Sequence, residues 1–238
     1  MIELIIQNQP DDETCGPTSL HAIYQYYGLD ISIEQIIQNL ERSISGGTLT
    51  PMLGVHALKQ GFNATAYIYN LNIFDPTWFT NNDADNQFLL DKLEAQLQYK
   101  QDPYMVKETL AYMEFLKLNG TIRFHSLNVD LLKKYFNKGI PILTALSATY
   151  LYRSPREVFT PEGKSIYDDV RGTPCGHFVV LCGYDENKRL VVVADPHATN
   201  PLSNNNYYKV SINRLINAIM LGVLTYDANL LIIEPKEG

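Results

Sequence analysis

Cys15 is the residue of this 238-residue sequence whose type and setting best suit nucleophilic chemistry. It is followed by Gly16 and Pro17, and proline is favoured in the first turn of a helix, so the thiol is expected at a helix N-terminus. The positive end of the helix dipole favours the thiolate, which is the nucleophilic form of cysteine. We therefore expect Cys15 to attack an electrophilic carbon, although a small packed cysteine has the same local sequence.

A nucleophilic cysteine needs a base that can also carry positive charge, and His177 is the candidate. It stands at the start of an apolar run that has the character of a strand. Asp195 ends the next apolar run, directly before Pro196, so a hairpin would bring its carboxylate beside the imidazole. Asp195 is expected to orient His177 and to stabilise the imidazolium.

Gln9, a few residues before Cys15, is the candidate for stabilising an oxyanion. Attack on an amide carbonyl requires hydrogen-bond donors aimed at the oxygen that becomes negative. The side-chain amide of Gln9 and the backbone N–H of Cys15 are predicted to form that hole.

These residues require a helix and a β-hairpin to position them. The apolar spacing of Leu20, Ile23, Tyr24 and Tyr27 predicts a helix over 17–27 that carries Cys15 at its front. Strands are predicted at 177–184 and 190–194, joined by a polar turn at 185–188.

Further elements surround this core. The start, 1–7, is predicted to be a short strand, and 154–174 and 197–206 are predicted loops at the rims of the cleft. Helices precede a mixed middle and antiparallel strands come last, which indicates a single α+β domain over 1–238. The other predicted helices are 33–40, 51–60, 86–99, 103–118, 129–137 and 212–219, and the other predicted strands are 64–69, 121–126, 141–146 and 230–233.

Taken together, the motifs resemble a papain-like cysteine peptidase, and most closely the double-glycine (bacteriocin-leader) peptidase-like family. The resemblance rests on Gln9, on Cys15 through Leu20, on Gly176 through Leu181, and on Asp195 with Pro196, within about 4–30 and 139–196. It implies a papain-like fold in which a helix carrying the cysteine packs on an antiparallel sheet carrying the histidine and aspartate. It also implies a peptide or related amide substrate, a Cys15 thioester, a Cys-His-Asp triad, an oxyanion role for Gln9, and no cofactor.

Three other interpretations use the same residues. An amine acceptor in place of water would make the protein an acyltransferase or a transglutaminase-like enzyme. A non-catalytic module could use the cleft to hold a peptide. Cys175, His177, Asp195 and His197 fall near one end of the hairpin and could ligate zinc, although they lack a tight metal-binding spacing.

The charge and the cysteines limit the setting. A net charge of −7 disfavours nucleic acid and anionic membranes as partners. Acidic residues at 11–13 and 168–169 favour a basic or amine-bearing substrate. The three cysteines do not form a disulfide pattern, because Cys175 and Cys182 lie too far apart on one strand to bridge. Together with the lack of a secretory signal at the start, free thiols indicate the cytoplasm.

Overall fold

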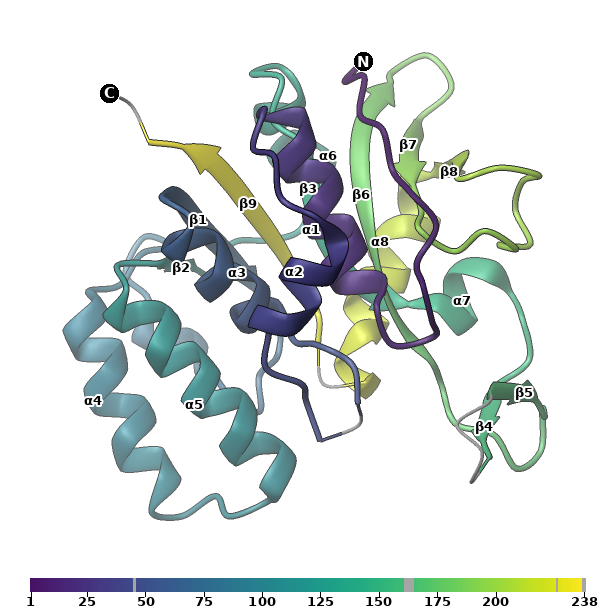
Figure 1. Ribbon diagram of the computed structural model, residues 1–238. Helices are drawn as coiled ribbons and strands as arrows, with labels where there is room; N and C mark the ends of the chain where they lie inside the picture. The colour runs from purple at the N-terminus through teal and green to yellow at the C-terminus, as the bar shows by residue number, and fades with distance from the viewer. Residues whose placement is uncertain (45, 161–164, 226, 237–238) are drawn as a thin grey trace.

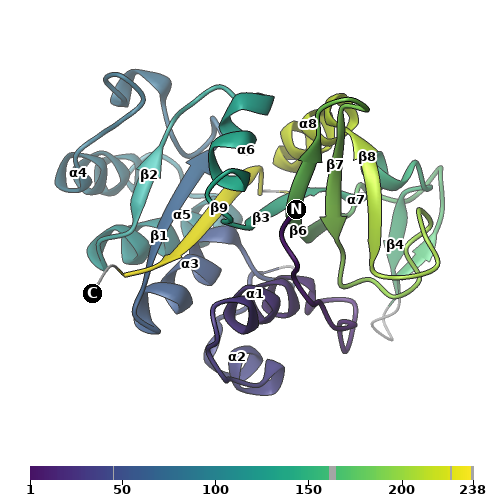
Figure 2. The same cartoon turned by 90° about the horizontal axis from the view of Figure 1, so that it is seen from above.

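The computed structural model describes residues 1–44, 46–160, 165–225 and 227–236. Its centre is a 7-stranded sheet with the strand order β2-β1-β9-β3-β6-β7-β8 (Figures 1 and 2). Neighbouring strands are antiparallel except for β1 and β2, which are parallel. The strands of this sheet are β1 (Phe62–Ile68), β2 (Thr121–Arg123), β3 (Ile142–Ser147), β6 (Gly176–Asp185), β7 (Leu190–Ala194), β8 (Tyr207–Ser211) and β9 (Asn229–Pro235).

Helices cover both faces of this sheet. Figure 2 shows α1 and α3 on one face and α6 and α8 on the other. The α4–α5 helix pair packs against α3 and extends the first layer (Figure 1). The helices are α1 (Cys15–Tyr26), α2 (Ile33–Asn39), α3 (Thr50–Lys59), α4 (Asn86–Leu97), α5 (Pro103–Lys117), α6 (Val129–Phe136), α7 (Ala148–Tyr152) and α8 (Ile212–Met220), with short 3₁₀ turns η1 (Pro76–Trp78) and η2 (Leu221–Thr225).

The central strands are mostly apolar because both of their faces are buried. On β6, Phe178, Val180 and Cys182 enter the core beneath α1 and α3. The alternate residues Val179 and Leu181 enter the core beneath α6 and α8. This two-residue period is what a strand between two helical layers requires.

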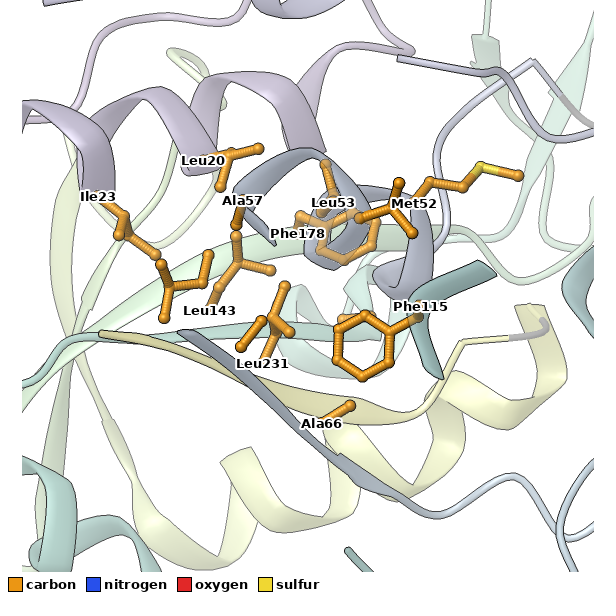
Figure 3. Close-up of a cluster of buried hydrophobic side chains, with 14 of the residues drawn as sticks. Leu20, Ile23, Met52, Leu53, Ala57, Ala66, Phe115, Leu143, Phe178 and Leu231 are labelled. Carbon is orange, nitrogen blue, oxygen red and sulfur yellow. The ribbon is translucent and has the colours of Figure 1, made fainter. Parts of the chain in front are cut away.

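The first core holds the helix that carries Cys15. Figure 3 shows Leu20 and Ile23 of α1 beside Ala57 of α3 and Leu143 of β3. All four side chains are buried. This packing attaches α1 to the sheet and so fixes the position of its first residue.

The α+β class is confirmed, as is the arrangement of a Cys15 helix packed on a mostly antiparallel sheet that carries His177 and Asp195. Ser32 and Gln35 form a reciprocal capping box that begins α2. Among the described residues, no helix combines the length and the apolar character needed to cross a bilayer.

The strand predicted at the N-terminus is wrong. Residues 1–9 are extended but belong to no strand. Both edges of β6 are occupied by β3 and β7, so the segment has no free edge to join. The N–H of Ile2 reaches the carbonyl of Cys182 at 2.8 Å, at the point where a bulge interrupts the pairing of β6 with β7.

The predicted loop at 154–174 also contains regular structure. It includes β4 (Glu157–Phe159) and β5 (Ser165–Tyr167), which pair as a small antiparallel hairpin. Residues 161–164 of this loop lie outside the described residues. The sequence analysis also missed α7 and β8, both of which bear on the site.

Candidate active site

Cys15 is the first residue of α1 and is half-buried. The hydroxyl of Ser19, one turn later, donates to the carbonyl of Phe178 on β6 at 3.3 Å, which ties the front of the helix to the sheet. Gly16 permits this close approach. A Cβ at position 16 would lie 2.3 Å from Oγ1 of Thr48 and 3.2 Å from the ring of Phe178. Gly16 thus lets the front of α1, which carries Cys15, lie closer to Thr48 and Phe178 than a larger residue would allow.

His177 lies on β6 and is 9% exposed. Its Nε2 is 2.8 Å from Oδ1 of Asp195. Cys15 lies close enough that its side chain and its charge help to raise the pKa of His177. Because Asp195 occupies Nε2, the ring nitrogen left to face the sulfur is Nδ1. The structure therefore brings the predicted cysteine, histidine and aspartate into one connected group.

Asp195 is fully buried directly after β7, and its carboxylate accepts four hydrogen bonds. Its Oδ1 accepts from His177 and from the backbone N–H of His197 at 2.9 Å. Its Oδ2 accepts from the hydroxyls of Tyr152 and Tyr208, each at 2.6 Å. A buried carboxylate is tolerated when it is satisfied in this way.

The electrostatics of this group favour a protonated His177 paired with an ionised Asp195. Burial alone lowers the pKa of His177, but the charge and hydrogen bond of Asp195, with a contribution from Cys15, raise it to about 10. Burial alone raises the pKa of Asp195, but His177, Tyr152 and Tyr208 together hold it below its usual range. Burial also raises the pKa of both tyrosines, so they stay neutral and donate.

Gln9 and His177 line the same pocket. Its backbone N–H donates to the carbonyl of Pro196 at 2.9 Å, which fastens it to the loop after Asp195. Its Nε2 donates to the carbonyl of Asp11 at 2.7 Å, which fixes the orientation of the amide. Cys15 starts a helix, so its own backbone N–H has no carbonyl one turn earlier within that helix.

Two pockets meet at His177. The larger, of about 680 Å³, is lined by Cys15 and by the apolar side chains of Leu146 and Phe178. The smaller, of about 310 Å³, is lined by Gln9 and His197. Both have His177, Cys175, Gly176, Asp12 and Phe159 in their walls. His177 therefore stands between two spaces, with Cys15 in the wall of the larger and Gln9 in the wall of the smaller.

The two loops predicted as rims contribute to these pockets. The first supplies Glu157, Phe159 and Tyr167, and the second supplies Thr199. Residues 161–164 of the first loop are not among the described residues.

Cys175 lines both pockets, and its thiol donates weakly to the carbonyl of Gly176. Burial and the nearby charge of Glu157 raise its pKa, so it is a poor nucleophile at neutral pH. Within the described ranges, no group of three or more His, Cys, Asp or Glu side chains is arranged to hold a metal ion. Cys175, His177, Asp195 and His197, all of them described, therefore do not form the zinc site that the sequence left open.

Tyr152 and Tyr208 are the residues that the sequence analysis missed. Tyr208 alternates with exposed residues on the short edge strand β8, and its side chain is buried. Tyr152 ends α7, and its ring lies 6.0 Å from that of His177, centroid to centroid. A short alternating run after an asparagine-rich loop was the only signal for β8.

Comparisons with known proteins bear on the identity of the chain. The peptidase domain of Streptococcus ComA, a bifunctional ABC transporter, is 12% identical over 99% of this chain and 100% of that chain, with a TM-score of 0.44. A double glycine motif protease from an AMS/PCAT transporter, solved with the leader peptide, is 14% identical over 99% and 94%, with a TM-score of 0.45. Xylellain, a cysteine protease from Xylella fastidiosa, is 12% identical over 98% and 83%, with a TM-score of 0.41.

Among curated proteins, none matches this sequence significantly. The model of the Peptidase_C39 like family, in contrast, matches residues 1–218, which is most of the chain. The resemblance inferred from the motifs is thereby confirmed, and the chain belongs to the Peptidase_C39 like family.

Proposed function

We propose that this protein is a cysteine-dependent hydrolase that cleaves a peptide or related amide bond through a thioester at Cys15. The observation that carries the proposal is the linked set of contacts from Cys15 to His177 to Asp195, at the junction of two pockets. The family and its fold are those of C39-like cysteine peptidases, which supports a hydrolase. We also infer that residues 1–238 act as one domain, because β1 and β9, far apart in sequence, are neighbours in one sheet.

In the first step, the Cys15 thiolate attacks the substrate carbonyl carbon and a C–S bond forms. The carbonyl electron pair moves to the oxygen, where the backbone N–H of Cys15 and Nε2 of Gln9 are the proposed donors. His177, held as imidazolium by Asp195, then gives its Nδ1 proton to the departing amine. The C–N bond breaks, and the acyl group remains on Cys15 as a thioester.

In the second step, water replaces the departed amine. The neutral imidazole of His177 takes a proton from that water, and the resulting hydroxide attacks the thioester carbon. Collapse of the tetrahedral intermediate breaks the C–S bond, releases a carboxylic acid and restores the charged pair. Asp195 stays ionised throughout, because Tyr152 and Tyr208 satisfy the oxygen that does not contact His177.

Alkylation of Cys15 tests, without a known substrate, whether its thiolate is paired with the imidazolium of His177. Wild type and the His177→Ala variant are treated with iodoacetamide at pH 6, and the modified residues are identified by peptide mapping. We expect wild-type Cys15 to react at least about tenfold faster than Cys15 of the variant, because only the thiolate is nucleophilic. Equal and slow reaction in both proteins would contradict the proposal. Cys175→Ser is the matched control and should react like wild type.

Hydrolysis itself is tested with a library of peptides in water enriched in ¹⁸O. Wild type should generate new C-terminal carboxylates that carry the label, whereas Cys15→Ala should generate none. Labelled products from both proteins would place the chemistry elsewhere.

A further inference from the structure

The larger pocket beside Cys15 is acidic. Its lining includes Asp12, Glu13 and Asp227. Neither this pocket nor the smaller one is lined by any lysine or arginine among the described residues. Glu13 has a cationic partner, because Arg42 lies 2.9 Å from its carboxylate. Asp227 differs from both of the others, because it is buried.

The carboxylate of Asp227 is held in place by three donors. Its Oδ2 accepts from the backbone N–H of Thr50 at 2.7 Å and from the hydroxyl of Thr50 at 3.0 Å. Its Oδ1 accepts from the side-chain amide of Asn229. Asp227 is 6% exposed, and no cation in the described part of the chain lies within ion-pair distance of it.

Helix capping explains the position of Asp227 but not its charge. Thr50 is the first residue of α3, so Asp227 satisfies a donor that the helix start leaves unpaired. Asparagine or serine caps a helix about as well as aspartate. The cap alone therefore does not require an ionisable carboxyl at this position in the pocket wall.

The charge of Asp227 is costly in its present surroundings. Burial raises its pKa to about 7, even though Thr50 and Asn229 oppose the shift. The buried Glu108 lies close by, and burial together with the Asp227 charge raises the pKa of Glu108 well above its usual value. A cation entering the pocket would relieve the cost of the unpaired Asp227 charge, because charges attract strongly away from water.

The apolar walls of this pocket suit an apolar stem. Leu146, Phe178 and Leu224 line this pocket together with the thiol. The methylene chain of a lysine or arginine packs well on such surfaces while its charged end reaches a polar group.

We propose that this pocket is a subsite for a cationic group on an apolar stem, such as a lysine or arginine side chain of the substrate, with Asp227 as the residue that determines specificity. The proposal rests on the function proposed for Cys15. Asp12, an exposed carboxylate in the pocket lining, attracts the cation, and Asp227 receives it at the pocket wall.

Reagents of matched size test the subsite independently of turnover. Methanethiosulfonates that carry a trimethylammonium or a sulfonate group form a mixed disulfide with the Cys15 thiolate and release sulfinate. Their rates at Cys15 are measured by peptide mapping in wild type, Asp227→Asn and the control Glu94→Gln, which loses the same charge from the exposed surface of α4. We expect a cationic preference that falls about tenfold in Asp227→Asn and is retained in Glu94→Gln. An equal preference in all three proteins would overturn the proposal.

A second variant guards against misfolding of Asp227→Asn. Thr225→Lys adds a cation to the pocket lining and leaves the Asp227 cap untouched. It should also abolish the cationic preference, and an unchanged preference in a folded Thr225→Lys protein would contradict the subsite.

Peptides that differ only by lysine, arginine or norleucine at each position test the substrate side. Wild type should cleave the basic peptides at least about tenfold faster at one position, and Asp227→Asn should lose that difference. Equal cleavage of basic and norleucine peptides would overturn the subsite while leaving the hydrolase intact. If no peptide is cleaved but the reagent preference depends on Asp227, the hydrolase proposal fails and the cation subsite stands.

Discussion

Tyr208 donates a hydrogen bond of 2.6 Å to Oδ2 of Asp195, the carboxylate oxygen that His177 does not contact. Tyr152, at the end of α7, donates to the same oxygen. The aspartate is therefore held by neutral donors on one side and by the imidazole on the other. This arrangement lets a fully buried carboxylate remain ionised next to a base.

Replacement of Tyr208 by phenylalanine should destabilise the protein by about 1.5–3 kcal/mol, because a buried charged acceptor loses a donor. Tyr208 helps to hold the pKa of Asp195 below its usual value of 3.8. Its contribution is therefore present above that value and is lost as the pH falls through the folded-state pKa. Urea unfolding should show the difference between wild type and Tyr208→Phe at pH 7 and a smaller difference below about pH 4. A difference that does not change with pH would argue against this role.

The pH profile of activity should report the state of His177. Its pKa is raised to about 10, so the imidazolium that protonates the leaving amine persists until the pH passes that value. Stability from this group is likewise full below 6.5 and is lost as the pH rises through about 10. We expect kcat/KM to fall above about pH 10 in wild type and at markedly lower pH in Asp195→Asn. An alkaline limb at the same pH in both proteins would show that Asp195 does not set it.

Removal of the Gln9 amide should affect catalysis more than folding. Loss of one oxyanion donor typically lowers kcat by about 10²–10³. The backbone of Gln9 stays bound to Pro196, so Gln9→Ala should fold normally. Asn8→Ala is the matched control, since Asn8 is the adjacent exposed amide. If Gln9→Ala keeps the wild-type kcat, its Nε2 serves only the contact with Asp11.

A side chain at the glycine after the nucleophile should disturb the packing at the front of α1. In Gly16→Ala the new Cβ would lie 2.3 Å from Oγ1 of Thr48, so either the Thr48 side chain or the front of α1 must shift. We expect a loss of about 1–3 kcal/mol in stability together with slower alkylation of Cys15. Part of both losses should be recovered in the double variant Gly16→Ala, Thr48→Ala.

Gly47→Ala is the control for that loss of stability, because a Cβ at Gly47 meets no atom within 4 Å. If the second substitution fails to recover any stability, the contact with Thr48 is not the cause.

The sequence was most informative where local chemistry and local structure coincide. Pro17 marks the start of a helix, and the apolar run after His177 marks a strand, so both positions were predicted together with their elements. Asp195 followed from the hairpin, since a turn of a few residues leaves little freedom in how two strands pair.

Tertiary contacts account for what the sequence did not reveal. Tyr152 and Tyr208 reach Asp195 from elements of 5 residues each, which are too short for a periodic pattern to identify. The N-terminal segment illustrates the opposite error. Ile2, Leu4 and Ile6 alternate and are buried like a strand, yet β6, which Ile2 contacts, already has a neighbouring strand on each edge.

The docking of α1 on β6 has a consequence for the newly made protein. The sulfur arrives with one layer of the molecule and the imidazole with another, and a few contacts such as that between Ser19 and Phe178 join them. A chain whose sheet has formed but whose first helix is still detached holds an isolated thiol and an isolated base. The proposed reactivity therefore requires the docked helix, and a chain in which α1 is separated from β6 lacks it.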